Sequence, residues 1–307
     1  MSTAVELTYR QGKVADLRET FVLGERVFHH TLGEPPSEAA IEDEWQLSRE
    51  LVEFVVAQEG CFWICEEGGE AVGFARMCRF GEMEELTQLA VAPSHQGRGI
   101  ARELLTRCWP DAPSPDLGRV VVAPGAPSDL TVYLDFSVMP VAGHWHLRAP
   151  AEEYTEHRSQ EIDAAEPPVV ALGADHAVNE WKLLEPPAIG HRRPLLHEFF
   201  GRTRTCLATL DGDRASALCW IGPRGEIGPA VGGTPEDLVP VVLQALDRVA
   251  RAKEPDALRI YCSTDSWWLL RRLRNLGFRV RWPSQVMCSI PLPGLDRYLP
   301  TRPAQLL

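Results

Sequence analysis

One stretch decides the fold of this chain: Leu86-Thr-Gln-Leu-Ala-Val-Ala-Pro-Ser-His-Gln-Gly-Arg-Gly-Ile-Ala101. It predicts a short apolar strand, a glycine-rich turn and an amphipathic helix over about residues 97–109. The helix is indicated by apolar residues that share one face at 3.6-residue spacing: Ile100, Leu104, Leu105, Cys108 and Trp109. Gln96–Ala101 therefore lies at a helix start, where unpaired backbone N–H groups can point at an anion. Its small residues would let a phosphate approach the main chain closely.

This stretch resembles the acyl-CoA loop of the GCN5-related N-acetyltransferases, through Gln-x-x-Gly-x-Ala placed after Leu-Ala-Val-x-Pro. The resemblance covers about residues 4–150. It implies an α/β fold with a mixed, mostly antiparallel twisted sheet flanked by helices, and acetyl-CoA as the cosubstrate. The residues that it implies for cofactor binding are Leu89, Ala90, Val91, Gln96, Gly97, Arg98, Gly99, Ile100, Ala101 and Arg102. The alternative is an ordinary strand-to-helix turn.

The order of predicted elements in the first half fits that family. A strand near residues 5–9 precedes two helices, and three antiparallel strands follow, the last being the strand of the quoted stretch. After its helix come a buried-type strand near 119–123, a short helix near 128–135 and a final strand pair near 138–148. We therefore expect a first domain over residues 1–150.

The second half repeats this order of elements, so the chain resembles two tandem folds of the family. We expect an acidic linker over 151–167 and a second domain over 168–307. The corresponding loop, Gly232-Gly-Thr-Pro-Glu-Asp237, lacks the family's spacing. Pro235 removes one donor N–H, and Glu236 and Asp237 place negative charge at a helix start, where it would repel a pyrophosphate. The second copy is thus expected to be degenerate and to bind no cofactor.

Two candidate catalytic residues follow from the resemblance. Tyr133 matches the family's tyrosine, which donates a proton to the departing CoA thiolate, although Ser137 and Val138 stand where the family has Gly-Phe. Glu85 matches the position of a general base, which takes the ammonium proton directly or through a water. Glu84 would point to the opposite face of the strand. The alternatives are an aromatic ring packed on a helix for Tyr133 and solvated charges at a strand end for Glu85.

Composition limits the function classes. The formal net charge of −12 over 307 residues argues against a nucleic-acid partner. No apolar run is long enough to span a membrane, and no secretory signal is visible, so we expect a cytoplasmic protein. The eight cysteines are scattered and predict buried free thiols. The pairs His29-His30 and His144-Trp-His146 lack a third ligand, so we expect no metal site.

These features predict an acetyl-CoA-dependent N-acetyltransferase that moves an acetyl group directly to the primary amine of a small molecule. The second domain would help to shape the acceptor site, and we expect a monomer or a homodimer. Two alternatives stay open. The chain could be a non-catalytic acyl-CoA-binding or regulatory module that keeps the loop, or a purely structural or partner-binding protein.

Overall fold

The protein is described here from a computed structural model that covers residues 6–33, 35–112, 114–124, 127–161, 166–253, 255–301 and 306–307, with only the backbone at 127–129. The chain divides into two compact units. Unit 1 comprises Met1–Val120 and Thr131–Ser137, and unit 2 comprises Val121–Leu130 and Val138–Leu307. The domains 1–150 and 168–307 are predicted from a repeated order of elements, whereas these two units are defined by compactness. The two tandem domains therefore stay a prediction.

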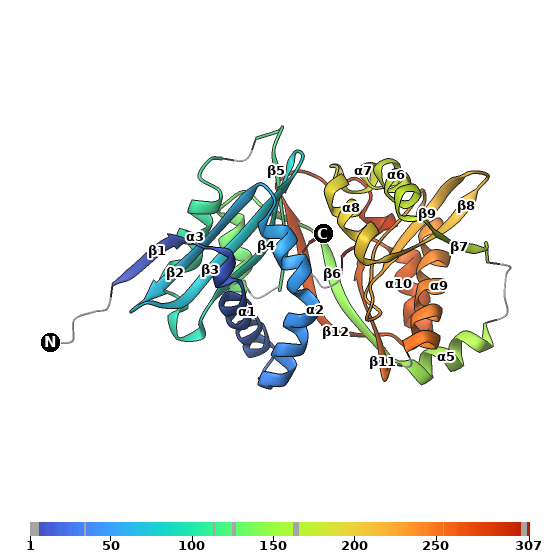
Figure 1. Ribbon diagram of the computed structural model, residues 1–307, viewed down its shortest axis with the longest axis horizontal. Coiled ribbons are helices and arrows are strands. Elements are labelled where there is room, and N and C mark those ends of the chain that lie inside the picture. The colour runs from blue at the N-terminus through green and yellow to red at the C-terminus, as the bar shows by residue number, and fades with distance from the viewer. Residues whose placement is uncertain are drawn as a thin grey trace. The chain divides into compact units, whose positions relative to one another are not determined.

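Unit 1 is an antiparallel sheet with helices on its faces (Figure 1). Its strands run in the order β1-β2-β3-β4, and each pair is antiparallel. The elements of this part of the chain are β1 Leu7–Gln11, η1 Val14–Asp16, α1 Leu17–Leu32, α2 Glu38–Val56, β2 Gly60–Glu67, β3 Glu70–Phe80, β4 Met83–Val91, η2 Pro93–His95 and α3 Ile100–Cys108. The strand β5 (Gly118–Ala123) and the helix α4 (Pro127–Leu134) are each divided between the two units.

Two helices cover one face of this sheet because each carries an apolar stripe. Ser37 begins α2 by accepting a hydrogen bond from the backbone N–H of Ala40 at 3.1 Å, which satisfies one of the first N–H groups of the helix. The stripes of α1 and α2 form one buried cluster with strand residues: Leu17, Phe21, Ile41, Trp45, Val52, Phe62, Ile64, Phe74 and Ala90. The other face receives α3, whose Ile100 and Leu104 lie against Gly73.

A bulge interrupts β4 at Thr87. Gln88 lies opposite Arg76 and Leu86 lies opposite Met77, so Thr87 is an extra residue in the ladder. Its hydroxyl donates a hydrogen bond to the carbonyl of Arg76 at 3.2 Å. Side chains alternate along a strand, and the extra residue reverses that alternation. Glu85 consequently shares a face with Gln88.

Unit 2 contains two groups of paired strands. The first has the order β12-β6-β11, and the second is the sheet β13-β10-β9-β8-β7. The strands are β6 Met139–Pro150, β7 Val169–Leu172, β8 Thr205–Asp211, β9 Arg214–Ile221, β10 Ile227–Gly232, β11 Ala257–Ser263, β12 Arg279–Cys288 and β13 Tyr298–Leu299. The helices are α5 Ala151–Gln160, α6 Ala174–Leu184, α7 Pro186–Ile189, α8 Pro194–Thr203, α9 Pro235–Lys253 and α10 Trp267–Asn275, with the short turn η3 Leu295–Arg297.

The predicted α/β class with a mostly antiparallel sheet flanked by helices is confirmed. From β7 to β12 the elements follow the same sequence as from β1 to β6, apart from the short helix α7. The core of unit 2 forms around α9, whose Leu238, Val242 and Leu246 are fully buried with residues of the surrounding strands. None of the described helices is long and apolar enough to cross a membrane.

Two expectations need correction. Cys61 on β2 and Cys108 on α3 are paired as a disulfide with their Cα atoms 5.7 Å apart, whereas the other six cysteines are free and buried. The two lie far apart in the sequence, and only the packing of α3 on the sheet brings them together. The motif helix begins at Ile100 rather than near Gly97, because both glycines of the loop have left-handed backbone.

Candidate active site

The loop that follows β4 has the shape of an anion cradle. The chain leaves β4 at Val91, turns through Pro93–His95 and enters α3 at Ile100. Between them Gly97 has φ +76° and Gly99 has φ +80°, conformations that residues with a side chain adopt only with strain. The two glycines are therefore required by the path of the backbone itself.

The helix start behind this loop offers unsatisfied donors. The first hydrogen bond of the helix runs from the N–H of Glu103 to the carbonyl of Gly99 at 3.1 Å. The N–H groups of Ile100, Ala101 and Arg102 come before it and have no acceptor within the helix. A Cβ atom added at Gly97 or Gly99 would meet no other atom within 4 Å, so the space in front of the loop is open. The cradle therefore fits a phosphate group.

Side chains at the rim of the cradle are held in place by carboxylates. Arg98 Nη2 and His95 Nε2 lie 2.8 and 2.9 Å from the two oxygens of Glu67. Hydrogen bonds from His95 and Arg98 lower the pKa of Glu67, so it is ionised at neutral pH. Arg102 pairs with Asp135, which lies just after α4. These pairs are partly exposed, and their effect is to orient the side chains rather than to stabilise the fold.

The strand before the loop is fixed by two hydrogen bonds. The side-chain amide of Gln96 donates to the carbonyl of Val91 at 3.2 Å, and the N–H of Ala92 donates to the carbonyl of Val72 at 2.8 Å. Ala90 lies opposite Phe74 in the ladder and is buried, while Leu89 is partly exposed. The ten residues predicted for cofactor binding thus lie at the end of β4 (89–91) and from the loop to the first turn of α3 (96–102).

The bulge at Thr87 determines which face of the sheet Glu85 occupies. Glu85 sits opposite Cys78 on β3, and its exposed fraction is 2%. Glu84 faces the other side and lies 3.3 Å from Arg119 Nε. Burial raises the pKa of Glu84 although the pairing with Arg119 opposes it. Of the two neighbouring glutamates, Glu85 is therefore the one on the face that carries α1.

Tyr133 is buried in the last turn of α4, with 4% of its surface exposed. The Arg102–Asp135 ion pair ties the residues that follow it to the first turn of α3. Ser137 has φ +60°, so it occupies a left-handed position that glycine fills in the family pattern. The structure thereby connects the segment of Tyr133 to the cradle.

Glu25 on α1 is a candidate that sequence reasoning did not single out. Burial, with a smaller contribution from the charge of Glu44, raises its pKa to about 7. It follows Gly24, which contacts Phe74 and the side-chain amide of Gln88 on β4. Sequence could have indicated it only as a charged residue beside the apolar stripe of α1. A carboxylate that titrates near neutral pH suits acid–base work.

Arg76 is a buried cation on the same face. Its exposed fraction is 1%, its Nη2 bonds to the side-chain oxygen of Gln88, and it lies beside the rings of Phe62 and Phe74. Within the described residues its Nη1 has no hydrogen-bond partner. Burial lowers the pKa of Arg76 to about 9. A buried donor without a hydrogen-bond partner costs free energy.

The corresponding loop of unit 2 is closed. Thr234 donates from its N–H and its hydroxyl to Asp237 at 3.0 and 2.8 Å, and the N–H of Asp237 donates back at 3.2 Å. This reciprocal cap satisfies the start of α9 with the protein's own carboxylate. A Cβ atom at Gly232 would lie 2.5 Å from the carbonyl of Thr234, so no open space faces this loop as it does at Gly99.

Comparison with known proteins agrees with this geometry. Residues 58–124, which include β3, β4, the loop and α3, match the family model described as an acetyltransferase (GNAT) domain. No curated protein matches the chain. Among solved structures, a putative acetyltransferase from Pyrococcus horikoshii aligns with a TM-score of 0.72 at 15% identity, over 100% of this chain and 99% of that one.

Two further structures are similar in fold. A GCN5-related N-acetyltransferase from Sphaerobacter thermophilus aligns with a TM-score of 0.59 at 16% identity, over 92% of this chain and 95% of that one. A tandem GNAT protein from the clavulanic acid biosynthesis pathway aligns with a TM-score of 0.56 at 16% identity, over 93% and 99% of the two chains. At these identities the likeness concerns the fold alone.

Proposed function

We propose that this protein transfers an acetyl group from acetyl-CoA to the primary amine of a small molecule. The match of residues 58–124 to an acetyltransferase (GNAT) domain supports the proposal, because this family and its fold support acyl transfer. The observation that carries the proposal is the open cradle at Gly97 and Gly99 in front of the first N–H groups of α3. An acceptor that carries positive charge suits a protein of net charge −12.

In this proposal the amides of Gly97–Ala101 hold the pyrophosphate of acetyl-CoA, and Leu89–Val91 align its pantetheine arm. Arg98 and Arg102 supply positive charge at the rim. The backbone N–H near Val91 polarises the carbonyl that is attacked. Acetyl-CoA supplies the activated acyl group, and the remaining chemistry is proton transfer by this chain's side chains.

Proton transfers accompany the formation of the C–N bond and the breaking of the C–S bond. Glu85, or a water that it holds, takes one proton of the acceptor ammonium so that the free amine can attack. Tyr133 gives its proton to the thiolate that departs when the tetrahedral intermediate collapses, and the second proton lost by the nitrogen returns Tyr133 to its protonated form. The position of Glu85 supports its role, because the carboxylate is buried on the face of the sheet that carries α1.

Calorimetric titration with acetyl-CoA tests the cradle. We expect Gly99→Glu to abolish binding, since the new carboxylate would project into the open space and repel the pyrophosphate. Gly212→Glu is the matched control, because Gly212 is also left-handed (φ +60°) and open but lies in the β8–β9 turn. Equal affinity in wild type and Gly99→Glu would refute the proposal. One acetyl-CoA per chain is expected, since Asp237 caps the start of α9.

Turnover separates an enzyme from the second candidate function. We expect CoA release with some member of a panel of small amines, and a loss of at least tenfold in Tyr133→Phe, which keeps the ring and removes the hydroxyl. Tight acetyl-CoA binding with no turnover over a broad panel would instead favour a non-catalytic acyl-CoA-binding module. Ser137, which replaces the family's glycine after α4, is the observation that keeps this alternative open.

A further inference from the structure

Unit 2 contains two adjoining cavities that lie far along α9 from its capped start. The first, of about 250 Å³, is lined by the end of β6, the β9–β10 turn and the start of β11. The second, of about 420 Å³, is lined by the end of α8, the β9–β10 turn and the last turns of α9. Gly225 and Val249 line both, so the cavities meet at the β9–β10 turn.

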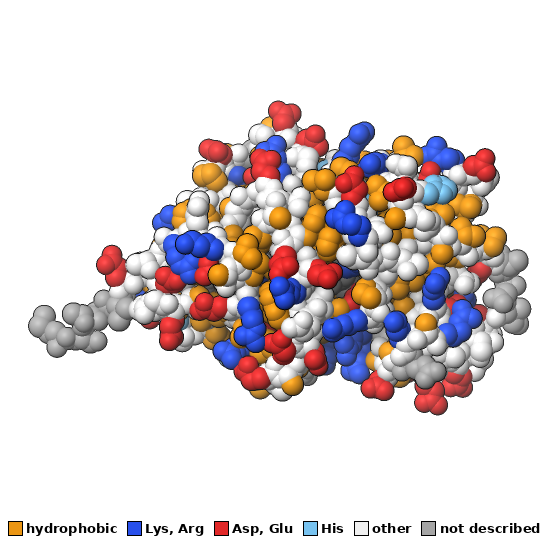
Figure 2. Space-filling model, in the orientation of Figure 1, with side chains coloured by type: hydrophobic (Ala, Val, Ile, Leu, Met, Phe, Trp, Pro, Cys, Tyr) orange, Lys and Arg blue, Asp and Glu red, His pale blue; other side chains and the backbone are white. Residues whose placement is uncertain are grey.

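The charge of these cavities contrasts with the rest of the protein. The charged side chains that line them are Arg148, Arg202, Arg204, Arg224, Arg248, Lys253, Asp256 and Arg259. Seven of these eight are cationic, in a chain with 43 acidic and 31 basic residues. On the face of the molecule that Figure 2 shows, the two signs are otherwise interspersed. The positive charge here is therefore a local feature and does not follow from the composition.

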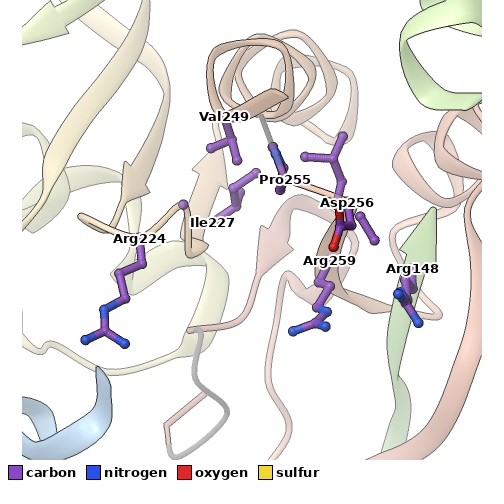
Figure 3. Close-up of a pocket in the computed structure, with 10 residues that line it drawn as sticks. Arg148, Arg224, Ile227, Val249, Pro255, Asp256 and Arg259 are labelled. Carbon is purple, nitrogen blue, oxygen red and sulfur yellow. The ribbon is translucent and has the colours of Figure 1, made fainter. Parts of the chain in front are cut away.

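Two of these arginines oppose each other directly. Arg259 on β11 and Arg148 on β6 are partners in the antiparallel register, and Arg279 on β12 is the partner of Arg148 on its other side. Directly opposed residues point to the same face, and like charges at such positions destabilise the sheet. Figure 3 shows Arg148, Arg224 and Arg259 extending to the same side of the first cavity, from a strand, a turn and a second strand.

Helix electrostatics accounts for only part of the cluster. Arg248 and Lys253 lie near the carboxyl end of α9, where cations are favoured. No such effect acts on Arg148 or Arg259, which stand on strands. Within the described part of the chain, which leaves out Glu254, no ion pair joins Arg148, Arg202, Arg248 or Lys253 to a carboxylate.

The backbone of the turn keeps the cavities open. Gly225 has φ +93°, and a Cβ atom there would lie 2.9 Å from Val249. The buried Glu226 accepts a hydrogen bond from the N–H of Arg224 at 3.0 Å and so fixes the turn from behind. Arg204 is held by the carbonyl of Gly228 and by the ring of Phe200, 4.0 Å from its guanidinium carbon. Part of the positive rim is thus built into the fold.

We propose that these two cavities form a binding site for a small polyanion, a molecule with at least two phosphate groups, one in each cavity. Guanidinium groups match phosphate oxygens in paired hydrogen bonds, and several converging arginines recognise multiply charged groups. Concave cavities of this size favour a small molecule over a nucleic-acid strand, whose binding needs a long basic track. A bound polyanion would also neutralise the repulsion between Arg148 and Arg259.

The test is calorimetric titration of the full-length chain with sodium tripolyphosphate at fixed ionic strength. We expect tripolyphosphate to bind at least tenfold more tightly than inorganic phosphate. The double variants Arg148→Gln/Arg259→Gln and Arg248→Gln/Lys253→Gln should each weaken this binding at least tenfold. Arg18→Gln/Arg49→Gln, on the exposed surfaces of α1 and α2, is the charge-matched control and should change it less than twofold.

Two further measurements separate loss of this site from unfolding and from phosphate binding at the cradle. The ligand-free melting temperature of each double variant is measured beside its affinity, so that lost binding in a variant that melts as wild type does cannot be ascribed to unfolding. In the Gly99→Glu background, which removes any phosphate binding at the cradle, Arg148→Gln/Arg259→Gln should still weaken tripolyphosphate binding at least tenfold. Unchanged affinity in both double variants, loss only in Gly99→Glu, or tighter binding of a single-stranded oligonucleotide than of tripolyphosphate would each overturn the proposal.

Discussion

Arg102, in the first turn of α3, is paired with Asp135, which stands two residues beyond Tyr133. The pair joins the helix that forms the cradle to the segment that carries the proposed acid. Through this pair a change at one of these elements can reach the other.

Breaking this pair should lower turnover and leave the fold intact. We expect Arg102→Gln and Asp135→Asn each to reduce the rate several-fold, because Tyr133 loses its fixed relation to the cradle. Both side chains are partly exposed, so the coupling is about 0.2–1 kcal/mol. The check is a double-mutant cycle on the rate, in which the double variant should be little worse than the poorer single variant. Strictly additive effects would show that the pair does not act as a unit.

The bulge at Thr87 predicts different roles for two neighbouring glutamates. Glu85→Gln should lower turnover about 10²–10⁴-fold at neutral pH while acetyl-CoA affinity stays within twofold, because it removes a proton acceptor and no binding group. Glu84→Gln is the matched control on the opposite face, where Glu84 meets Arg119. Steady-state rates together with acetyl-CoA titrations provide the measurement. Equal losses in the two variants would contradict the assignment.

Glu25 should make the stability of the protein depend on pH. Burial raises its pKa from 4.5 to about 7 in the folded state. Below pH 4.5 the carboxyl of Glu25 is protonated in both the folded and the unfolded chain. Between pH 4.5 and 7 it ionises in the unfolded chain but not in the folded one. The free energy of unfolding therefore falls as pH rises through this range. This pKa shift corresponds to a loss of about 3 kcal/mol in the free energy of unfolding above pH 7.

Chemical unfolding of Glu25→Gln at several pH values checks this. The variant should be more stable than wild type at pH 8 by about that amount and should match it near pH 4. Glu50→Gln, on the exposed surface of α2, should show no such difference. A wild-type protein whose stability relative to Glu25→Gln does not change between pH 4 and 8 would show that Glu25 ionises normally.

A buried ion network should dominate the stability of unit 2. Glu185 lies 2.6 Å from Arg193 Nη2 and 2.7 Å from His197 Nε2, and all three are at most 1% exposed. Burial raises the pKa of Glu185, but the charges of Arg193 and His197 outweigh it and lower the pKa to about 2. Its stabilisation is therefore present above pH 4.5 and is lost as pH falls toward 2.

Removing this carboxylate leaves a buried cation without its counter-ion. Glu185→Gln should reduce the free energy of unfolding by about 3–5 kcal/mol at pH 7. Glu198→Gln on α8, which removes an exposed pairing with Lys182, should cost at most about 1 kcal/mol. Denaturant unfolding at pH 7 measures both, and equal small losses would show that the network contributes little.

The sequence alone determined the cradle. Glycine at positions that need left-handed backbone, an apolar strand before them and an apolar helix face after them are local features, and a local pattern fixes local structure. For the same reason the mostly antiparallel α/β class, the family whose model residues 58–124 match and the order of elements could be predicted. The reciprocal cap of Thr234 and Asp237 adds a physical reason why the second loop differs from the first.

Tertiary structure decided what depends on residues far apart in the sequence. One extra residue in β4 sets the face of Glu85, and the packing of α1 on the sheet, not any motif, raises the pKa of Glu25. Cys61 meets Cys108 only because α3 packs on β2, and Arg148 meets Arg259 only because β6 pairs with β11. Register, burial and long-range pairing arise when the whole chain packs, so no stretch of sequence carries them by itself.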